Sequence, residues 1–316
     1  MTTPTWPQKI GTGIFGVLCF PLFFLDFLFC QIYLGLRKIG VITRKTQGGL
    51  AIITTKICWT IAVSCCFWIR RVDTEKTSPG AWDSFIADLD AHDAAVEKGA
   101  TRQPYFILSN HLGYFDTFII VVHTPLKVLW RVRCYMGAFL YGIPLFATIC
   151  KTIGHFPVYF LKNEDGKFSV DQTKMAKVET WVEQHLGSGG ILSLFPEGAV
   201  NKAPATLQTF RHGTFKKALE KNAKIWHFVL MGHEDVWPVN APIGAYPAHT
   251  GMKLIPMCPQ GARVTLAKLR ENPDIPSGVS DQQLLADHCR ETMQKQYDDL
   301  KAFVGELKSG KKTKSA

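Results

Sequence analysis

The sequence predicts an α/β protein: a mixed sheet flanked by helices, preceded by an N-terminal membrane segment of two helices. Short apolar strands alternate with amphipathic helices from about residue 100 to residue 270, a pattern typical of α/β domains. Two long apolar runs precede that region, and the first exceeds the roughly 20 residues that span a bilayer. We therefore expect a membrane-associated helical hairpin over residues 1–72, an α/β domain over 73–307 and a disordered basic tail over 308–316.

The expected hairpin consists of the apolar runs Ile10–Leu36 and Ala51–Ile69. A basic link over residues 37–45 follows the first run, and Arg70 and Arg71 follow the second. Two full spans would place one of these basic clusters on the far side of the bilayer, against the positive-inside tendency. Two arrangements remain: a hairpin that dips into one leaflet, which we favour, or one span followed by an interfacial segment.

The elements of the α/β domain follow from the spacing of apolar residues and from glycine, proline and capping residues between them. The expected helices are 81–98, 115–122, 139–154 (in two pieces, because of Pro144), 170–186, 210–221 and 282–307. The expected strands are 105–108, 128–136, 156–161, 191–195, 224–231, 252–257 and 263–266.

Composition narrows the class of partner. The formal charge is +10, from 36 basic and 26 acidic residues, which suits an anionic membrane surface or acidic substrates. No Lys/Arg-rich helix or zinc-finger spacing points to nucleic acid, and no motif points to a metal. The nine cysteines form no CxxC pair, and the five in apolar stretches (19, 30, 58, 65 and 66) are expected to be buried and reduced. We expect an intracellular membrane, such as the endoplasmic reticulum, with the α/β domain facing the cytosol.

His111 and Asp116 lie five positions apart, directly after the expected strand 105–108. A histidine is the usual proton-transfer group at neutral pH, and a carboxylate that holds its second ring nitrogen fixes the tautomer and the ring orientation. Gly113 permits a turn from strand to helix that would bring the two side chains together. The simpler interpretation is a loop histidine and an aspartate that caps a helix, and the spacing alone does not exclude it.

A second polar stretch, Phe195-Pro196-Glu197-Gly198, ends the expected buried strand 191–195. In open α/β sheets, ligand sites lie beyond the carboxyl ends of the strands, so Glu197 is placed as a site residue would be. The simpler interpretation is a solvated loop carboxylate. The sequence contains no GxSxG nucleophile elbow and no HExxH zinc motif.

Together, Asn110-His111 with Asp116 and the later Phe195-Pro196-Glu197-Gly198 resemble the motifs of the glycerolipid acyltransferase family, the lysophosphatidate acyltransferase-like (PlsC-type) proteins. The resemblance covers roughly residues 75–260 and includes Ile143-Pro144, Arg211-His212-Gly213 and Val236-Trp237-Pro238. It implies direct acyl transfer: His111 deprotonates a glycerol hydroxyl, Asp116 orients His111, and the hydroxyl attacks an acyl-CoA thioester. The resemblance implies no acyl-enzyme, no metal and no cofactor, with acyl-CoA as co-substrate.

The resemblance also implies residues that bind substrate. Glu197 and Gly198 would position the acceptor, and Asn110 would shape the turn or the oxyanion environment. Many relatives continue the second motif with Thr-Arg, whereas Ala199-Val200 stand here. Phosphate binding would then fall to other cations. The candidates are Lys162, Lys202 and Arg211.

The favoured acceptor is a membrane lysophospholipid, 1-acylglycerol 3-phosphate, which would become phosphatidate in phospholipid biosynthesis. Two alternatives remain open. The Val200-Asn201 pair and the Asp235-Val236-Trp237-Pro238 loop resemble tafazzin-type transacylases, which need no acyl-CoA. A non-catalytic membrane lipid-binding protein that keeps the fold is the more distant alternative.

Overall fold

The computed structural model describes residues 4–162, 168–276 and 278–309. Most of the predicted basic tail, residues 310–316, lies outside the described residues. By its internal contacts the chain forms two compact units, each assembled from separate segments. The first unit comprises residues 1–15, 66–120 and 194–316, and the second comprises residues 16–65 and 121–193.

The first unit contains a sheet in the order β1–β9–β8–β2, formed by β1 (Ile69–Val72), β9 (Ala248–Cys258), β8 (Lys224–Met231) and β2 (Tyr105–Leu108). β1 and β9 are parallel, β2 and β8 are parallel, and β8 and β9 are antiparallel. The predicted mixed sheet is therefore confirmed. Its helices are α3 (Thr74–Thr77), α4 (Ala81–Glu97), α5 (Phe115–His123), α9 (His212–Lys221), α10 (His233–Val236), α11 (Ala262–Arg270) and α12 (Asp281–Lys308).

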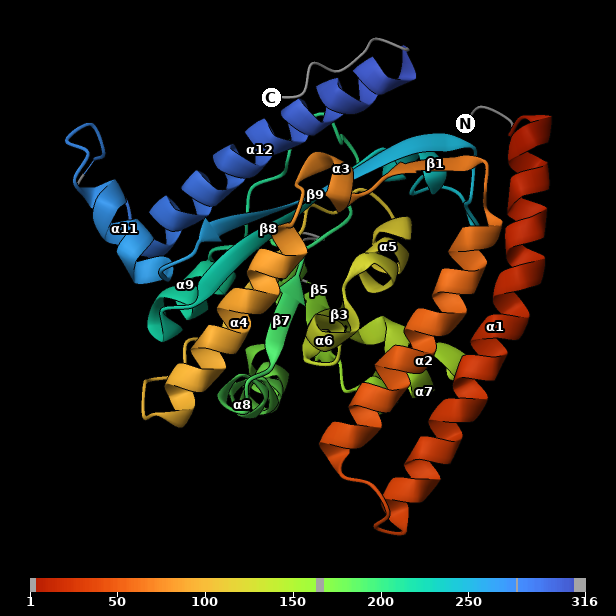
Figure 1. Ribbon diagram of the computed structural model, residues 1–316, viewed down its shortest axis with the longest axis horizontal. Helices are drawn as coiled ribbons and strands as arrows, with labels where there is room; N and C mark the ends of the chain where they lie inside the picture. The colour runs from red at the N-terminus through yellow and green to blue at the C-terminus, as the bar shows by residue number, and fades with distance from the viewer. Residues whose placement is uncertain (1–3, 163–167, 277, 310–316) are drawn as a thin grey trace. The chain divides into compact units, whose positions relative to one another are not determined.

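Helices cover both faces of this sheet, because side chains that alternate along β8 contact helices on opposite sides. The Trp226 ring packs against Phe85 of α4, with the ring centroids 5.0 Å apart. The next residue, His227, points to the other face, where its Nδ1 lies 3.0 Å from Gln296 Oε1 of α12. The side chains of successive strand residues point to opposite faces of the sheet, so one strand can pack against a helix on each side. Figure 1 shows α12 running along β8 and β9.

The second unit contains the parallel strands β7 (Ile191–Leu194, whose last residue belongs to the first unit), β3 (Val132–Gly137) and β4 (Phe156–Val158), and an antiparallel pair, β5 (Phe160–Lys162) and β6 (Phe168–Val170). Its helices are α2 (Arg44–Cys65), α6 (Leu126–Leu129), η1 (Ala138–Gly142), α7 (Pro144–Ile153) and α8 (Gln172–Gly187). It also includes residues 16–38 of α1 (Trp6–Lys38).

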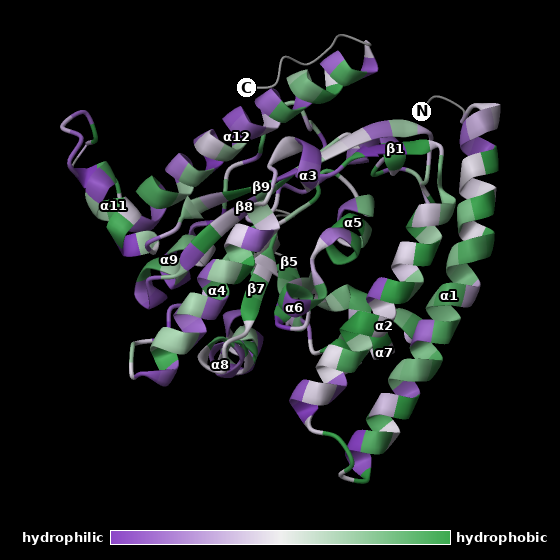
Figure 2. Cartoon of the chain, viewed as in Figure 1, coloured by the Kyte–Doolittle hydropathy of each residue, from purple (hydrophilic) through white to green (hydrophobic). Residues whose placement is uncertain are grey.

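Helices α1 and α2 pack side by side within the second unit (Figure 1). The Tyr33 hydroxyl lies 2.8 Å from Thr54 Oγ1, and Thr55 Oγ1 donates to Asp26 Oδ2 at 2.8 Å. Both helices are long and apolar enough to cross a membrane, by length and composition. Figure 2 shows hydrophobic residues along both of them. The predicted pair of apolar N-terminal helices is therefore present, whereas its mode of membrane association stays a prediction.

Three details differ from the predicted elements. Residues 263–266, predicted as a strand, belong to helix α11, because so short an apolar run does not distinguish the two periods. The predicted strand 128–136 is a short helix, α6, followed by β3, and Pro125 caps that helix. The second apolar run was predicted to extend to Ile69, but helix α2 ends at Cys65, and residues 69–72 form the strand β1. Cys65 is also exposed rather than buried, since it is the last residue of α2.

Candidate active site

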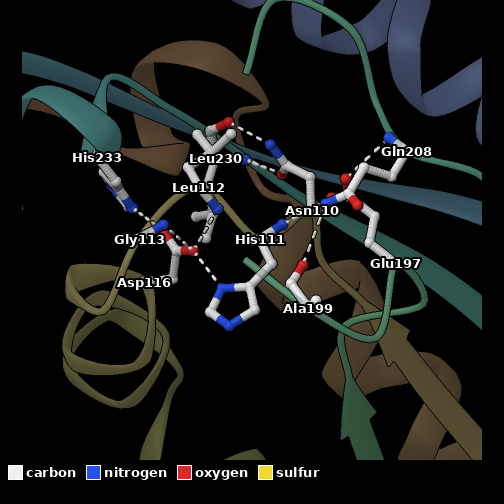
Figure 3. Close-up of polar contacts among 10 residues, drawn as sticks. All are labelled: Asn110, His111, Leu112, Gly113, Asp116, Glu197, Ala199, Gln208, Leu230 and His233. Carbon is white, nitrogen blue, oxygen red and sulfur yellow. Dashed lines mark hydrogen bonds and ion pairs between the residues drawn. The ribbon is translucent and has the colours of Figure 1, made fainter. Parts of the chain in front are cut away.

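The two predicted motifs meet, because His111 N donates to Glu197 Oε1 at 2.9 Å (Figure 3). His111 follows β2, and β2 is the parallel neighbour of β8, so the residues after both strands lie at the same edge. The Asn110 side chain continues this pairing beyond β2. Its Nδ2 atom donates to Leu230 O and its Oδ1 atom accepts from Leu230 N, both at 2.8 Å. Asn110 thus ties the turn to β8, while its predicted role in shaping the turn or the oxyanion environment stays a prediction.

Asp116 is the acceptor at the centre of this turn. Its Oδ2 atom accepts from His111 Nδ1 at 2.8 Å and from the main-chain N–H groups of Leu112 and Gly113 at 2.7 and 3.0 Å. The predicted turn therefore does bring the histidine and the carboxylate together. A Cβ atom at Gly113 would lie 2.7 Å from Trp237 O, so the turn requires glycine. Asp116 also lies in the first turn of α5, where a negative charge is favourable.

The second oxygen of Asp116 has a partner that the sequence analysis missed. Asp116 Oδ1 accepts from His233 Nδ1 at 2.8 Å, and both side chains have an exposed fraction of 0%. His233 begins α10 directly after β8 and Gly232. The available signal was a histidine soon after the buried strand 224–231, a position like that of His111 after strand 105–108.

These contacts set the charge state of Asp116. Burial raises the pKa of Asp116, but the hydrogen bonds from His111 and His233 outweigh that effect, and the pKa falls to about 2. Asp116 is therefore a carboxylate at every pH at which the protein would work. Because the pKa is lowered in the folded state, this carboxylate stabilises the fold above the ordinary pKa of aspartate, and the contribution is lost as pH falls toward about 2.

The other face of His111 is arranged for proton transfer. Its ring stacks on Phe195, with centroids 3.9 Å apart and an interplanar angle of 9°. With Nδ1–H donated to Asp116, the lone pair lies on Nε2. The side chain is 17% exposed, and no described residue forms a hydrogen bond to Nε2. The ring therefore presents Nε2 as a base that a substrate hydroxyl could approach.

Glu197 holds the main chain of His111. Glu197 Oε1 accepts from His111 N, and Oε2 accepts from Gln208 N, each at 2.9 Å. Asn201 N donates to His111 O at 2.7 Å, so the loop after β7 binds both main-chain polar groups of the histidine. Burial raises the pKa of Glu197, and the N–H groups of His111 and Gln208 offset part of that rise. The buried Glu197 oxygens thus have partners within the protein, and its predicted contact with the acceptor stays a prediction.

We expect Glu197→Gln to destabilise the protein, because a glutamine has only one acceptor for these two N–H groups. Its NH₂ group would face one of them, leaving a buried donor unsatisfied at a cost of about 1–3 kcal/mol. Unfolding in urea would measure the loss. Gln208→Ala is the matched control, since it keeps the main-chain N–H and removes only a side-chain contact to Ala199 O at 3.4 Å. An unchanged urea midpoint for Glu197→Gln would contradict this account of the loop.

The other predicted substrate-binding residues lie in different places. Gly198 has a φ of 74°, and a Cβ atom there would lie 3.1 Å from Arg211 Nε, so the exposed Arg211 side chain lies beside it. Lys202 is exposed on the same loop. Lys162 ends β5 in the second unit, and its side chain lies outside the described residues. Phosphate binding by these three cations therefore stays a prediction. In the described segments, no group of three or more His, Cys, Asp or Glu residues could hold a metal ion.

Comparisons with known proteins agree with this geometry. Residues 91–231 match the family model described as Acyltransferase, and this range includes both motifs. The fold is similar to the crystal structure of the 1-acyl-sn-glycerophosphate (LPA) acyltransferase PlsC from Thermotoga maritima, with a TM-score of 0.59. The two chains are 13% identical, and the match covers 93% of this chain and 99% of the other. A search of curated protein sequences finds no match.

Proposed function

We propose that the chain is a member of the glycerolipid acyltransferase family and that it transfers a fatty acyl group from acyl-CoA to the free hydroxyl of a lysophospholipid. The observation that carries the proposal is the His111 ring, whose Nδ1 is bound to a buried carboxylate and whose Nε2 has no partner among the described residues. We propose 1-acylglycerol 3-phosphate as the acceptor, because the structural neighbour acts on that class of lipid and the chain has a formal charge of +10.

The proposed reaction needs one base and no covalent enzyme intermediate. His111 Nε2 accepts the proton of the acceptor hydroxyl as its oxygen attacks the thioester carbonyl carbon. The tetrahedral intermediate collapses, the carbon–sulfur bond breaks, and the imidazolium returns its proton to the CoA thiolate. Asp116 stays ionised throughout and stabilises the transient imidazolium. Each proton and electron pair is thereby accounted for without a metal or a redox partner.

A lysolipid panel tests the proposal. Purified full-length protein would be incubated with radiolabelled acyl-CoA and, in turn, lysophosphatidate, glycerol 3-phosphate and lysolipids with neutral head groups. We expect label in phosphatidate, with lysophosphatidate preferred over the neutral lysolipids. Absence of label in every product would contradict the enzymatic proposal and favour a non-catalytic lipid-binding protein.

A second candidate is transfer between phospholipids without acyl-CoA, as in tafazzin-type transacylases. It is favoured by Ala199 and Val200, which stand where many relatives carry Thr-Arg, and by the Asp235–Pro238 loop. The discriminating experiment omits acyl-CoA and supplies a labelled phospholipid donor. Transfer that needs acyl-CoA supports the first candidate, whereas undiminished transfer in its complete absence supports the second.

A further inference from the structure

A second histidine shares the carboxylate of the catalytic pair. His233 lies 117 positions after Asp116 and reaches it because β8 ends beside β2. Its place is fixed by Gly232, which has a φ of 79°, and a Cβ atom there would lie 2.2 Å from His249 O. The Phe115 ring packs against the imidazole, with an interplanar angle of 87° and centroids 5.5 Å apart. The ring is thus held firmly while its Nδ1 faces Asp116.

We propose that His233 is a positioning residue for acyl transfer, which holds Asp116 by Oδ1 so that Oδ2 is directed at His111. This inference rests on the proposed function. Of the four hydrogen bonds that described residues form to the carboxylate, three converge on Oδ2, and His233 supplies the one to Oδ1. Without His233, that oxygen would be buried with no donor from the described residues, and the carboxylate could rotate away from His111.

The buried contacts also assign the proton on His233. Its Nε2 atom is buried and has no hydrogen-bond partner in the described chain. A doubly protonated ring would therefore bury an unpaired N–H, whereas a neutral ring with its proton on Nδ1 leaves only a lone pair unpaired. We assign the neutral Nδ1–H form. His233 then acts on Asp116 as a dipolar donor that withdraws electron density from the carboxylate.

This donor matters at the moment when His111 carries a proton. A carboxylate that accepts a strong hydrogen bond is a weaker base, so it leaves that proton on the imidazolium, which can pass it to the leaving thiolate. Within the described residues, four titratable groups interact electrostatically with Asp116: His111, His233, Glu197 and Glu234. The two glutamates have raised pKa values because they are buried, and their negative charges oppose that of Asp116. The two histidine contacts thus favour the ionised Asp116.

Two substitutions with amide side chains distinguish the effect of losing the hydrogen-bond donor from the effect of replacing the histidine ring. The amide nitrogen of asparagine stands about where Nδ1 stands in histidine, and that of glutamine about where Nε2 stands. His233→Asn therefore keeps a donor toward Asp116, and His233→Gln moves it away. We expect His233→Gln to lower kcat about 10- to 100-fold, the value of one hydrogen bond to a charged group, with KM little changed. His233→Asn should recover kcat to within about threefold, because it restores that bond.

The pH profile supplies a readout that simple loss of packing would not move. Without the donor, Asp116 binds a proton more readily and holds the His111 proton more tightly, and both effects oppose the active form at low pH. The acid limb of kcat should therefore move to higher pH in His233→Gln and return in His233→Asn. Wild-type kinetics in His233→Gln, or an equal loss in both variants with unmoved acid limbs, would overturn the inference.

Modification of His111 by diethylpyrocarbonate keeps this test independent of acyl transfer. The reagent attacks unprotonated imidazole, so its rate at His111, followed by mass spectrometry against pH in the full-length protein, reports the same acid limb. If wild type transfers no acyl group, the proposed function fails, and this profile still decides on His233. If His233→Gln does not fold, His233→Asn decides: a modification profile unlike wild type would overturn the inference, and an unchanged one supports it.

Discussion

Replacing His111 by alanine is expected to reduce acyl transfer by about 100-fold or more, the usual contribution of a general base. The fold should survive, because the main-chain N–H and C=O groups of residue 111, which bind Glu197 and Asn201, remain in the variant. The loss should appear in kcat, since the imidazole acts on the reacting hydroxyl and is not the binding site for the acyl chain or the head group. Initial rates with labelled acyl-CoA would measure it.

A matched control for this substitution is His288→Ala. It removes another partly buried histidine, which lies on α12 and has no place in the proposed mechanism. We expect its kcat to match wild type. If His111→Ala retained full activity while binding of the substrate stayed intact, the assignment of the base would be wrong, whatever the family of the chain.

Replacing Asp116 by asparagine is the second substitution with a large expected effect, a loss of roughly 10²- to 10⁴-fold in kcat. The shape is conserved, but the charge that stabilises the imidazolium is lost. The amide also has one acceptor where the carboxylate has two, and four donors converge on this position. Whichever way the amide turns, its NH₂ group faces either His233 or the donors on the His111 side.

The double variant tests whether His111 and Asp116 act as a unit. Residues that act together are strongly non-additive, so His111→Ala with Asp116→Asn should lose little more activity than His111→Ala alone. Asp171→Asn is the matched control for the change from carboxylate to amide. Asp171 caps α8 by accepting from Lys174 N, and asparagine caps helices about as well. Fully multiplicative losses in the double variant would show that Asp116 does not act through His111.

The parts of the fold predicted correctly are those whose signals are local. Strand β2 is an uninterrupted apolar run between Pro104 and Ser109, and β8 is apolar except for Lys224 and His227 and is followed by Gly232. The predicted bounds of both strands, 105–108 and 224–231, are those of the structure. Residues 263–266 were misassigned because an alternating pattern of four residues fits one turn of helix as well as a strand. The packing of α11 against the rest of the first unit determines that these residues form a helix. A local sequence pattern carries no information about that packing.

In the candidate site, too, local contacts were predicted and contacts between distant segments were not. The five-residue spacing with Gly113 predicted the contact between His111 and Asp116, since all of it lies within one turn. The partners of Glu197 could not be predicted, because they are main-chain N–H groups, which every residue but proline carries. His233 was missed because its contact depends on the neighbouring positions of β2 and β8, and a single sequence does not reveal strand order.

The two main-chain bonds that join His111 to the loop after β7 have a consequence for how the site assembles. One runs from His111 N to Glu197 and the other from Asn201 N to His111 O, across a separation of about 90 residues. Each segment provides hydrogen-bond partners for polar groups of the other. If either segment moves away, the polar groups of the other lose their partners. They therefore order as one cooperative unit. A chain that loses the loop by local opening loses its base at the same moment, so an inactive but folded state needs no change in His111 itself.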